Sequence, residues 1–237
     1  MTFITALSVR ERPRAEPWVR DVPAVAHLLA RGRLELAHPV TVITGDNGVG
    51  KSTLLHAIAR GYGFNTAGGA YRIETAGFPD PLFHTVRVET GPRAKQGYFL
   101  RAEKHFDHAT ELGDDGPNAH NLHHMSHGES VMTLVETFVP DGVYLLDEPE
   151  SGLSAVRQMA LLAMLHRLSQ RGAQIIMVTH SPILLAIPGA HIVEITQDAL
   201  STAIDLESTL AYRAMRDWLE DPAGVARFMI EVTDPER

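Results

Sequence analysis

The sequence predicts an α/β fold, in which helices flank a mostly parallel sheet and an antiparallel β part and a short helical lobe are added. Three apolar runs, at 40–44, 143–146 and 175–178, have the continuous hydrophobicity of strands that are buried on both faces. Helical patterns at 51–60 and 154–170 follow the first two runs. Together they indicate an open α/β sheet, which places its ligands at the carboxyl ends of the strands.

In the first hundred residues, prolines and glycines mark where the predicted strands and helices end. Pro13 and Pro17 interrupt the chain between a first strand and a short helix. Alternating and β-branched residues predict a strand at 83–89, and the glycines between 61 and 77 predict a loop. The expected elements are strands at 3–10, 34–36, 40–44 and 83–89, and helices at 22–30 and 51–60.

The rest of the chain is expected to begin with a strand at 97–101, before a polar, irregular segment at 103–125. Gly172 is expected to cap the helix at 154–170, and Asp221 with Pro222 to end the last helix. The further elements are helices at 129–139 and 208–219 and strands at 143–146, 175–178 and 192–195. We expect 1–237 to form one domain, with 97–140 as the short helical lobe and 205–237 as a C-terminal helical extension.

The most specific motif is the phosphate-binding loop at 45–52, Gly-Asp-Asn-Gly-Val-Gly-Lys-Ser, which matches G-x-x-x-x-G-K-[ST] between a strand and a helix. Its glycines allow backbone N–H groups to turn toward anionic oxygens, and the helix start adds unpaired donors. Lys51 would reach the β- and γ-phosphates, and Ser52 would hold Mg²⁺. The predicted nucleotide-binding residues here are Asn47, Gly48, Val49, Gly50, Lys51, Ser52 and Thr53.

Two acids, Asp147 and Glu148, end the apolar run that begins at 143. Asp147 would complete the Mg²⁺ shell with Ser52, directly or through water. Glu148 would polarise an attacking water, as a general base does. A protein that only binds the nucleotide does not need this second acid, so Glu148 favours an ATPase over the alternative of a strand that ends in two solvated carboxylates.

Three further motifs occur in a fixed order along the chain: Gln96, then Ser126-His127-Gly128-Glu129, then His180 at the end of an apolar strand. With the phosphate-binding loop and the acidic strand, this order resembles the ATP-binding cassette (ABC) ATPases. The chain looks closest to the stand-alone predicted AAA-family ATPases that are related to the heads of SMC and Rad50 proteins. The resemblance covers about residues 1–200.

The resemblance implies roles for single residues. Gln96 would contact Mg²⁺ or the attacking water, and His180 would bind the γ-phosphate and help to place that water. Ser126 and Gly128 match the signature that faces a nucleotide held by the other subunit, and 150–154 would be the D-loop that crosses the dimer interface. An ATP-dependent homodimer follows from this, and the preference for ATP over GTP rests on the resemblance alone.

The signature departs from that of transporter cassettes, which have Ser-Gly-Gly-Gln where this chain has Ser-His-Gly-Glu at 126–129. The segment from Gln96 to Ser126 is about thirty residues long, too short for a coiled-coil arm and smaller than a transporter's helical lobe. We therefore expect a soluble ATPase that acts as a dimerisation switch. The alternatives are the nucleotide-binding subunit of an ABC transporter, or a regulatory ATPase of a nuclease or DNA-repair partner.

The composition agrees with this expectation. The 237 residues include no cysteine and no long apolar run, which predicts a cytoplasmic protein without disulfides or a membrane segment of its own. The net charge of −8 excludes a globally basic nucleic-acid-binding surface. DNA or a protein effector stays possible as a partner, since Arg10, Arg12, Arg14 and Arg20 form either a local basic patch or a solvated loop.

Two clusters keep two interpretations each. The histidines between 105 and 127 form either a metal site or a polar lobe near the nucleotide; they are His105, His108, His120, His123, His124 and His127. In the C-terminal helix, Leu210, Met215, Trp218 and Leu219 either pack against the domain or form a docking stripe for a partner.

Overall fold

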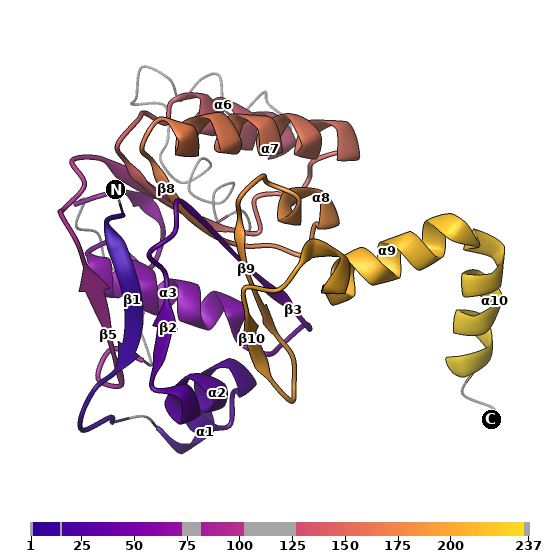
Figure 1. Cartoon of the computed structure of the whole chain (residues 1–237), viewed down its shortest axis with the longest axis horizontal. Coiled ribbons are helices and arrows are strands. Elements are labelled where there is room, and N and C mark those ends of the chain that lie inside the picture. Colours follow the sequence, from indigo (N-terminus) through magenta and orange to yellow (C-terminus); the bar gives the residue numbers. More distant parts are fainter. Residues whose placement is uncertain (1, 15, 73–81, 102–126, 235–237) are drawn as a thin grey trace.

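The computed structural model describes residues 2–14, 16–72, 82–101 and 127–234, with 127–129 described as backbone only. Its strands form two sheets (Figure 1). The strands are β1 (Ile4–Val9), β2 (Arg33–Glu35), β3 (Val40–Gly45), β4 (Gly69–Ala70), β5 (Val86–Thr90), β6 (Gly97–Arg101), β7 (Val143–Asp147), β8 (Gln174–Val178), β9 (His191–Ile195) and β10 (Leu200–Thr202). The helices are α1 (Pro17–Arg20), α2 (Pro23–Arg31), α3 (Lys51–Tyr62), α6 (His127–Glu136), α7 (Ala155–Gln170), α8 (Pro182–Leu185), a 3₁₀ turn at Leu206–Ser208, α9 (Leu210–Glu220) and α10 (Pro222–Val232).

The larger sheet has seven strands in the order β10-β9-β3-β8-β7-β6-β4. The five inner strands run parallel, and the short β10 and β4 are antiparallel to their neighbours at the two edges. β1 lies between β2 and β5 in a separate antiparallel sheet of three strands. The predicted fold class, a mostly parallel sheet flanked by helices with an antiparallel part, is therefore confirmed.

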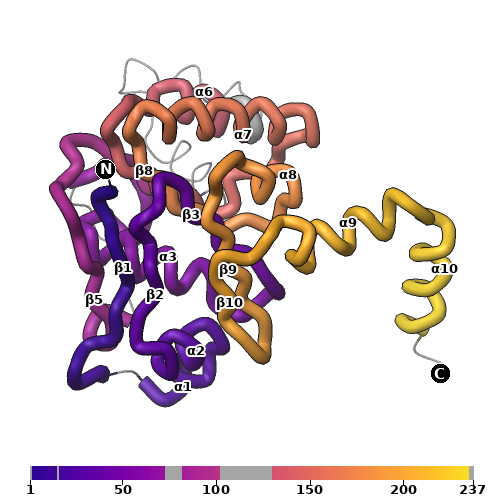
Figure 2. Tube along the Cα trace, viewed as in Figure 1, coloured from indigo at the N-terminus to yellow at the C-terminus, as the bar shows by residue number. Residues whose placement is uncertain are grey.

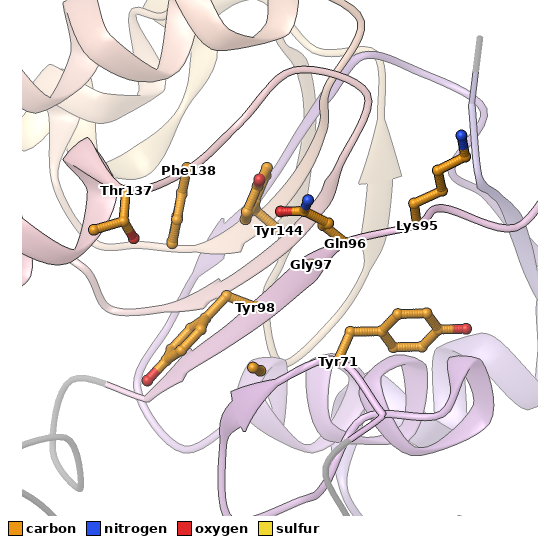
Figure 3. A pocket seen from close by; sticks show the side chains of 9 residues that line it. Tyr71, Lys95, Gln96, Gly97, Tyr98, Thr137, Phe138 and Tyr144 are labelled. Carbon is orange, nitrogen blue, oxygen red and sulfur yellow. The ribbon is translucent and has the colours of Figure 1, made fainter. Parts of the chain in front are cut away.

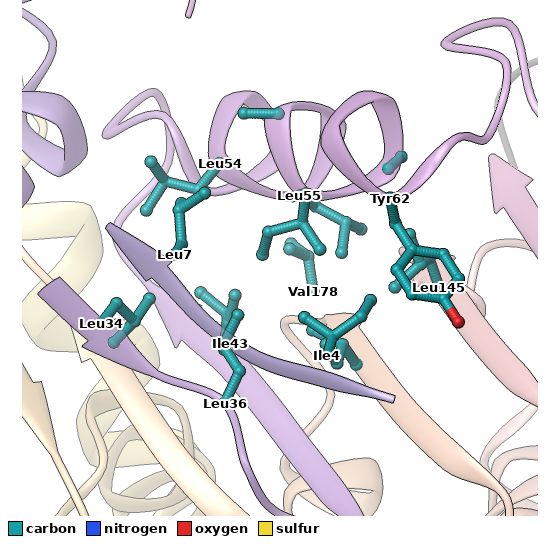
Figure 4. Packing of buried hydrophobic residues seen from close by; sticks show 14 of the residues in the cluster. Ile4, Leu7, Leu34, Leu36, Ile43, Leu54, Leu55, Tyr62, Leu145 and Val178 are labelled. Atoms are coloured by element: carbon teal, nitrogen blue, oxygen red, sulfur yellow. The ribbon is translucent and has the colours of Figure 1, made fainter. Parts of the chain in front are cut away.

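Successive residues of the inner strands point to opposite faces of the sheet and so enter two different cores. Ile43 and Val178 pack with Leu54 and Leu55 of α3, together with residues of the antiparallel sheet (Figure 4). Their neighbours in sequence pack with α7 on the other face; this second core includes Val42, Leu146, Met177, Leu161 and Leu165. Because both faces are covered, the strands are apolar throughout rather than alternating.

One buried side chain joins the two sheets. Gln174, at the start of β8, has no exposed surface. Its Oε1 accepts hydrogen bonds from the N–H groups of Phe3 and Ile4, both at 2.8 Å. Its Nε2 donates to the carbonyl oxygens of Ile4 at 2.7 Å and Leu36 at 2.8 Å. The antiparallel sheet is thereby fixed to the strand that lies beside β3.

Several predicted boundaries need correction. The strand expected at 83–89 begins only at Val86, because Thr85 and Val86 both donate to the carbonyl of Leu82 in a turn. The helix expected at 129–139 ends at Glu136, and the expected loop at 61–77 contains the last two residues of α3 and the short β4. The sequence analysis also missed the short elements α1, α8 and β10 and the whole of α10.

The C-terminal helices form an arm, α9 followed by α10, that extends away from the two sheets (Figure 1). The trace bends sharply between the two helices (Figure 2). Asp221 ends α9 as predicted, but its carboxylate also accepts from the N–H of Gly224 and so caps α10. Within the described ranges, no helix has the length and hydropathy needed to cross a membrane.

Candidate nucleotide site

Three loops meet at one edge of the large sheet. β8 lies between β3 and β7, and all three run parallel, so their carboxyl ends lie together. The phosphate-binding loop follows β3, the acids Asp147 and Glu148 end β7, and His180 follows β8 by two residues. The topology therefore places most of the predicted catalytic groups at this edge, although they are up to 135 positions apart along the chain, from Gly45 to His180.

The backbone of the phosphate-binding loop requires glycine at both ends. Gly45 has φ +127°, and a side chain there would collide with the backbone carbonyl of Ile195. Gly50, the N-cap of α3, has φ +93°. Asn47 and Gly48 are exposed at the tip of the loop, whereas Val49 is buried in the first core. The loop is thus anchored by one apolar residue and leaves its tip open to a ligand.

Lys51 is only 5 % exposed, and its ammonium lies inside the curve of the loop. Nζ donates to the carbonyl oxygens of Gly45 at 3.1 Å and Asp46 at 2.6 Å. Burial lowers the pKa of Lys51, an effect that the nearby carboxylates of Glu148, Asp46 and Asp147 partly oppose. Anionic oxygens placed in the loop would restore the missing solvation of this cation.

Ser52 and Asp147, two of the three predicted metal ligands, are in direct contact. Ser52 Oγ donates to Asp147 Oδ1 at 2.9 Å. The other carboxylate oxygen, Oδ2, lies 3.1 Å from Nε2 of His56, a residue that the sequence analysis missed. His56 follows Ser52 by four positions, so it lies one turn further along the same face of α3. That spacing was the signal in the sequence that could have identified it.

Glu148 has an unusual backbone conformation for the residue expected to act as the base. Its φ is +50°, in the left-handed region that costs energy for any residue with a side chain. Its N–H donates to the carbonyl of Val178 at 3.0 Å, which holds it beside β8. Glu148 Oε1 lies 3.7 Å from His180 Nε2, and both side chains are 38 % exposed. The chain therefore holds Glu148 in a strained position that faces both His180 and solvent.

The segment predicted as the D-loop, 150–154, is tied to the histidine loop. Glu150 Oε1 accepts from the N–H of His180 at 2.7 Å. Burial raises the pKa of Glu150, although hydrogen bonds from Thr179 and the backbone of His180 oppose the shift. Burial and the charge of Lys51 lower the pKa of His180, which favours its neutral form. Ser154 caps α7 by accepting from the N–H of Arg157.

The assignment of Gln96 to the metal or the attacking water is wrong. Gln96 precedes β6, and β6 runs parallel to β7 with Arg101 opposite Asp147. Gln96 thus lies at the opposite edge of the sheet, about 16 Å from Asp147 at the usual rise per strand residue. Arg101 occupies the edge near Asp147 instead, where its Nη1 donates to the carbonyl of Thr66 at 3.0 Å.

Gln96 lines a separate pocket of about 260 Å³ between β6, β7 and the end of α6 (Figure 3). The rings around it are Tyr71, Tyr98, Phe138 and Tyr144, and Lys95 and Thr137 also line it. Phe138 and Tyr144 are stacked with their ring centroids 4.0 Å apart. The sequence did contain the signal for this position, since Gln96 stands before its strand, whereas every other predicted catalytic side chain stands at or after the end of one.

The signature residues are described only in part. Ser126 lies outside the described residues, as do all of the clustered histidines except His127, of which only the backbone is described. Gly128 lies in the first turn of α6. Among the residues whose side chains the structure describes, no group of three or more His, Cys, Asp or Glu could hold a metal ion. The interpretation of the histidines as a metal site stays a prediction.

Comparison with known proteins shows which proteins the chain is similar to. A family model described as "AAA domain, putative AbiEii toxin, Type IV TA system" matches residues 99–186, and a second model, "AAA domain", matches residues 28–110. The ATP-binding export protein CcmA of cytochrome c biogenesis, from Bartonella quintana (strain Toulouse), is 28 % identical over 172 residues, which are 65 % of this chain and 80 % of that protein. These matches confirm the resemblance to ABC-type ATPases.

Two solved structures resemble the chain more distantly. A metal-chelate type ABC transporter in an inward-facing conformation matches with a TM-score of 0.47 and 15 % identity, over 91 % of this chain and 89 % of that one. The SMC head domain of Thermotoga maritima matches with a TM-score of 0.41 and 16 % identity, over 81 % of this chain and 94 % of that one.

Proposed function

We propose that this chain binds ATP with Mg²⁺ in the loop that follows β3 and hydrolyses it. The contact between Ser52 and Asp147, at 2.9 Å, carries the proposal. It joins a hydroxyl at the start of α3 to a carboxylate at the end of β7, directly beside Lys51 and Glu148. Hydroxyl and carboxylate oxygens are the protein ligands that Mg²⁺ prefers, so the residues present fit this ion.

Each residue has a separate task in the proposed reaction. Lys51 exchanges its contacts with two backbone carbonyls for contacts with phosphate oxygens, and the N–H groups of the loop surround the same anion. Ser52 and Asp147 would hold Mg²⁺, which would neutralise charge on the phosphates. Glu148 takes a proton from water while the water oxygen attacks the γ-phosphorus and the bond to the β–γ bridging oxygen breaks. His180, at 3.7 Å from Glu148, helps to place that water.

The Glu148→Gln variant tests the assignment of the base. It should bind ATP with Mg²⁺ as the wild type does and lose nearly all turnover, because the amide cannot accept the proton. Glu207→Gln, an exposed glutamate far from the site in sequence, is the matched control and should turn over ATP at the wild-type rate. Turnover of Glu148→Gln near the wild-type rate would refute the role of Glu148.

We further propose that two copies enclose two ATP molecules, so that the protein is an ATP-dependent dimerisation switch. Each nucleotide would lie between the Lys51 loop of one copy and the Ser126–Gly128 signature of the other, and hydrolysis would release the two copies. The link between the D-loop and His180 supports this, since it connects a segment expected at the interface to the catalytic groups. A protein effector or DNA would receive the change.

A mixing experiment tests the shared sites. Lys51→Ala and Gly128→Asp chains should each be inactive alone, because each removes one half of both sites. In an equal mixture, half of the dimers are mixed and contain one intact site, so about a quarter of the wild-type turnover should return. No recovery in a mixture that does form mixed dimers would overturn the shared arrangement.

A second candidate function is the nucleotide-binding subunit of a transporter. The relative that favours it is described as an export protein. No described helix of this chain is long and apolar enough to span a membrane. Purification from detergent-solubilised membranes separates the two functions: a stable complex with an integral membrane protein supports transport, and recovery of the chain alone supports the switch.

A further inference from the structure

We propose that the arm formed by α9 and α10 joins two copies of this chain, without nucleotide, by packing the arm of one copy against the arm of the other. The arm holds most of the exposed apolar surface. Twelve large apolar side chains are exposed among the described residues, and only Trp18, Phe83, Val156 and Met159 lie elsewhere. The arm contributes Leu210, Met215, Trp218, Leu219, Phe228, Met229, Ile230 and Val232.

These side chains form a stripe on each helix. On α9, Met215, Trp218 and Leu219 follow the helical spacing of three and four residues. On α10, Phe228, Met229 and Val232 repeat the pattern. The exposed fractions of these six side chains range from 43 % for Met215 to 64 % for Leu219. The helices thus have the amphipathic faces of packed helices, and the other residues that the structure describes leave those faces exposed.

Among the described residues, only the start of α9 contacts the body, where Ala211 packs against the second core and the N–H of Leu210 donates to Glu194. No residue of α9 or α10 is buried, and each helix has only 11 residues. Isolated helices of that length are marginal in water, and most helical stability in proteins comes from packing an apolar face. Both helices nevertheless have well-formed starts: Thr209 accepts from the N–H of Tyr212, and Asp221 caps α10 before Pro222. The sequence specifies two helices whose apolar faces need a covering surface.

The charges of the arm favour a second copy over a membrane surface. Within 210–232 there are three arginines, Arg213, Arg216 and Arg227, and four acids, Asp217, Glu220, Asp221 and Glu231. A helix that binds anionic lipid has an excess of basic over acidic residues, and this arm has no such excess. Charges of both signs can instead pair across a two-fold axis, where each copy offers the same surface to the other.

The exposed area also suits a stable dimer. If each of the eight side chains exposes about 100 Å², as half of a large apolar side chain does, the arm offers on the order of 800 Å². A standard interface buries about that area on each partner. The inference is independent of the proposed function, because the arm contains no residue of the nucleotide site. Joined arms would also raise the effective concentration of the two nucleotide sites for each other.

Light scattering on the full chain without nucleotide tests the arm. The expected mass is twice that of the 26.0 kDa chain. The double variant Trp218→Glu and Leu219→Glu should have the mass of one chain. Trp18→Glu changes an exposed tryptophan outside the arm, 62 % exposed, and should keep the double mass. Circular dichroism checks that the variants retain the folded body.

A wild-type mass of one chain up to high micromolar concentration would overturn the proposal, as would a double variant that still has the double mass. A second experiment uses vesicles of phosphatidylserine and phosphatidylcholine. Co-sedimentation of a single-chain species that the double variant loses would overturn it in favour of a membrane surface. Adding ATP and Mg²⁺ to the double variant that also carries Glu148→Gln reports on the nucleotide-dependent dimer alone. If the mass of that triple variant does not rise with ATP while the wild type has the double mass, the proposed nucleotide-dependent dimer is refuted and the proposed arm-to-arm contact is supported.

Discussion

Replacing Gln174 by methionine should destabilise the protein strongly without creating a cavity. Methionine has a similar unbranched length, so the volume at this fully buried position is nearly conserved. The amide, however, is lost. The N–H groups of Phe3 and Ile4 then have no acceptor, and each buried unsatisfied donor costs about 1–3 kcal/mol. The carbonyls of Ile4 and Leu36 also lose a donor, but a carbonyl with a second lone pair tolerates this better.

The expected loss is therefore about 4 kcal/mol in the free energy of unfolding, a large part of the 5–15 kcal/mol of a typical protein. For a chain of this size it corresponds to a fall of roughly 8–16 °C in Tm. Urea unfolding followed by circular dichroism measures it, with an unchanged slope against urea as the check that only stability changed. Gln170→Met, at the exposed end of α7, is the control and should stay within about 0.5 kcal/mol. A loss below about 1 kcal/mol at Gln174 would refute the reasoning.

Three further changes have defined outcomes. His56→Ala should raise the Mg²⁺ concentration needed for tight ATP binding about tenfold, because His56 orients the metal ligand Asp147. His56→Gln should recover part of the Mg²⁺ affinity. Equal Mg²⁺ titrations of wild type and His56→Ala would exclude a role of His56 in metal binding. Gln96→Ala should leave ATP turnover within about twofold of wild type, because Gln96 lies at the far edge of the sheet; a loss of a hundredfold would contradict the fold. Burial and the nearby His38 lower the pKa of His191 in the folded state, so the unfolded chain binds the proton more readily. The free energy of unfolding should therefore fall as the pH drops below 6.5. Urea unfolding of His191→Gln should show a weaker fall over the same pH range.

The parts of the site that the sequence could predict are those with local geometry. The phosphate-binding loop requires glycines and a lysine at fixed spacing before one helix, and the acids require only the end of one strand. The prediction for Gln96 was wrong because the place of this residue depends on the direction of β6 relative to β7. That direction is a property of the sheet and not of the segment. His56 was missed for a related reason, since its partner Asp147 lies 91 positions further along the chain.

The C-terminal helix was left with two interpretations because its spacing is the same whether its apolar face meets the body or a partner. The structure favours the second, since Trp218 and Leu219 are 48 % and 64 % exposed. α10 was missed because Asp221 and Pro222 end one helix and also begin the next: proline cannot continue α9, yet it suits the first turn of α10. A helix stop and a helix start have the same sequence here.

The contacts around Glu150 indicate how formation of the proposed dimer would reach the chemistry. Glu150 fixes the backbone of His180 at 2.7 Å, and Gln158 of α7 joins both loops, since it donates to the carbonyl of Leu153 at 3.0 Å and accepts from Ser181 Oγ at 2.6 Å. The segment 150–154 and the histidine loop are therefore joined by hydrogen bonds. Glu148 is attached to the same loops, because its N–H donates to the carbonyl of Val178 and its own carbonyl accepts from the N–H of Ser151. A partner that contacted the D-loop would therefore act on Glu148 and His180 together, whose side chains lie 3.7 Å apart.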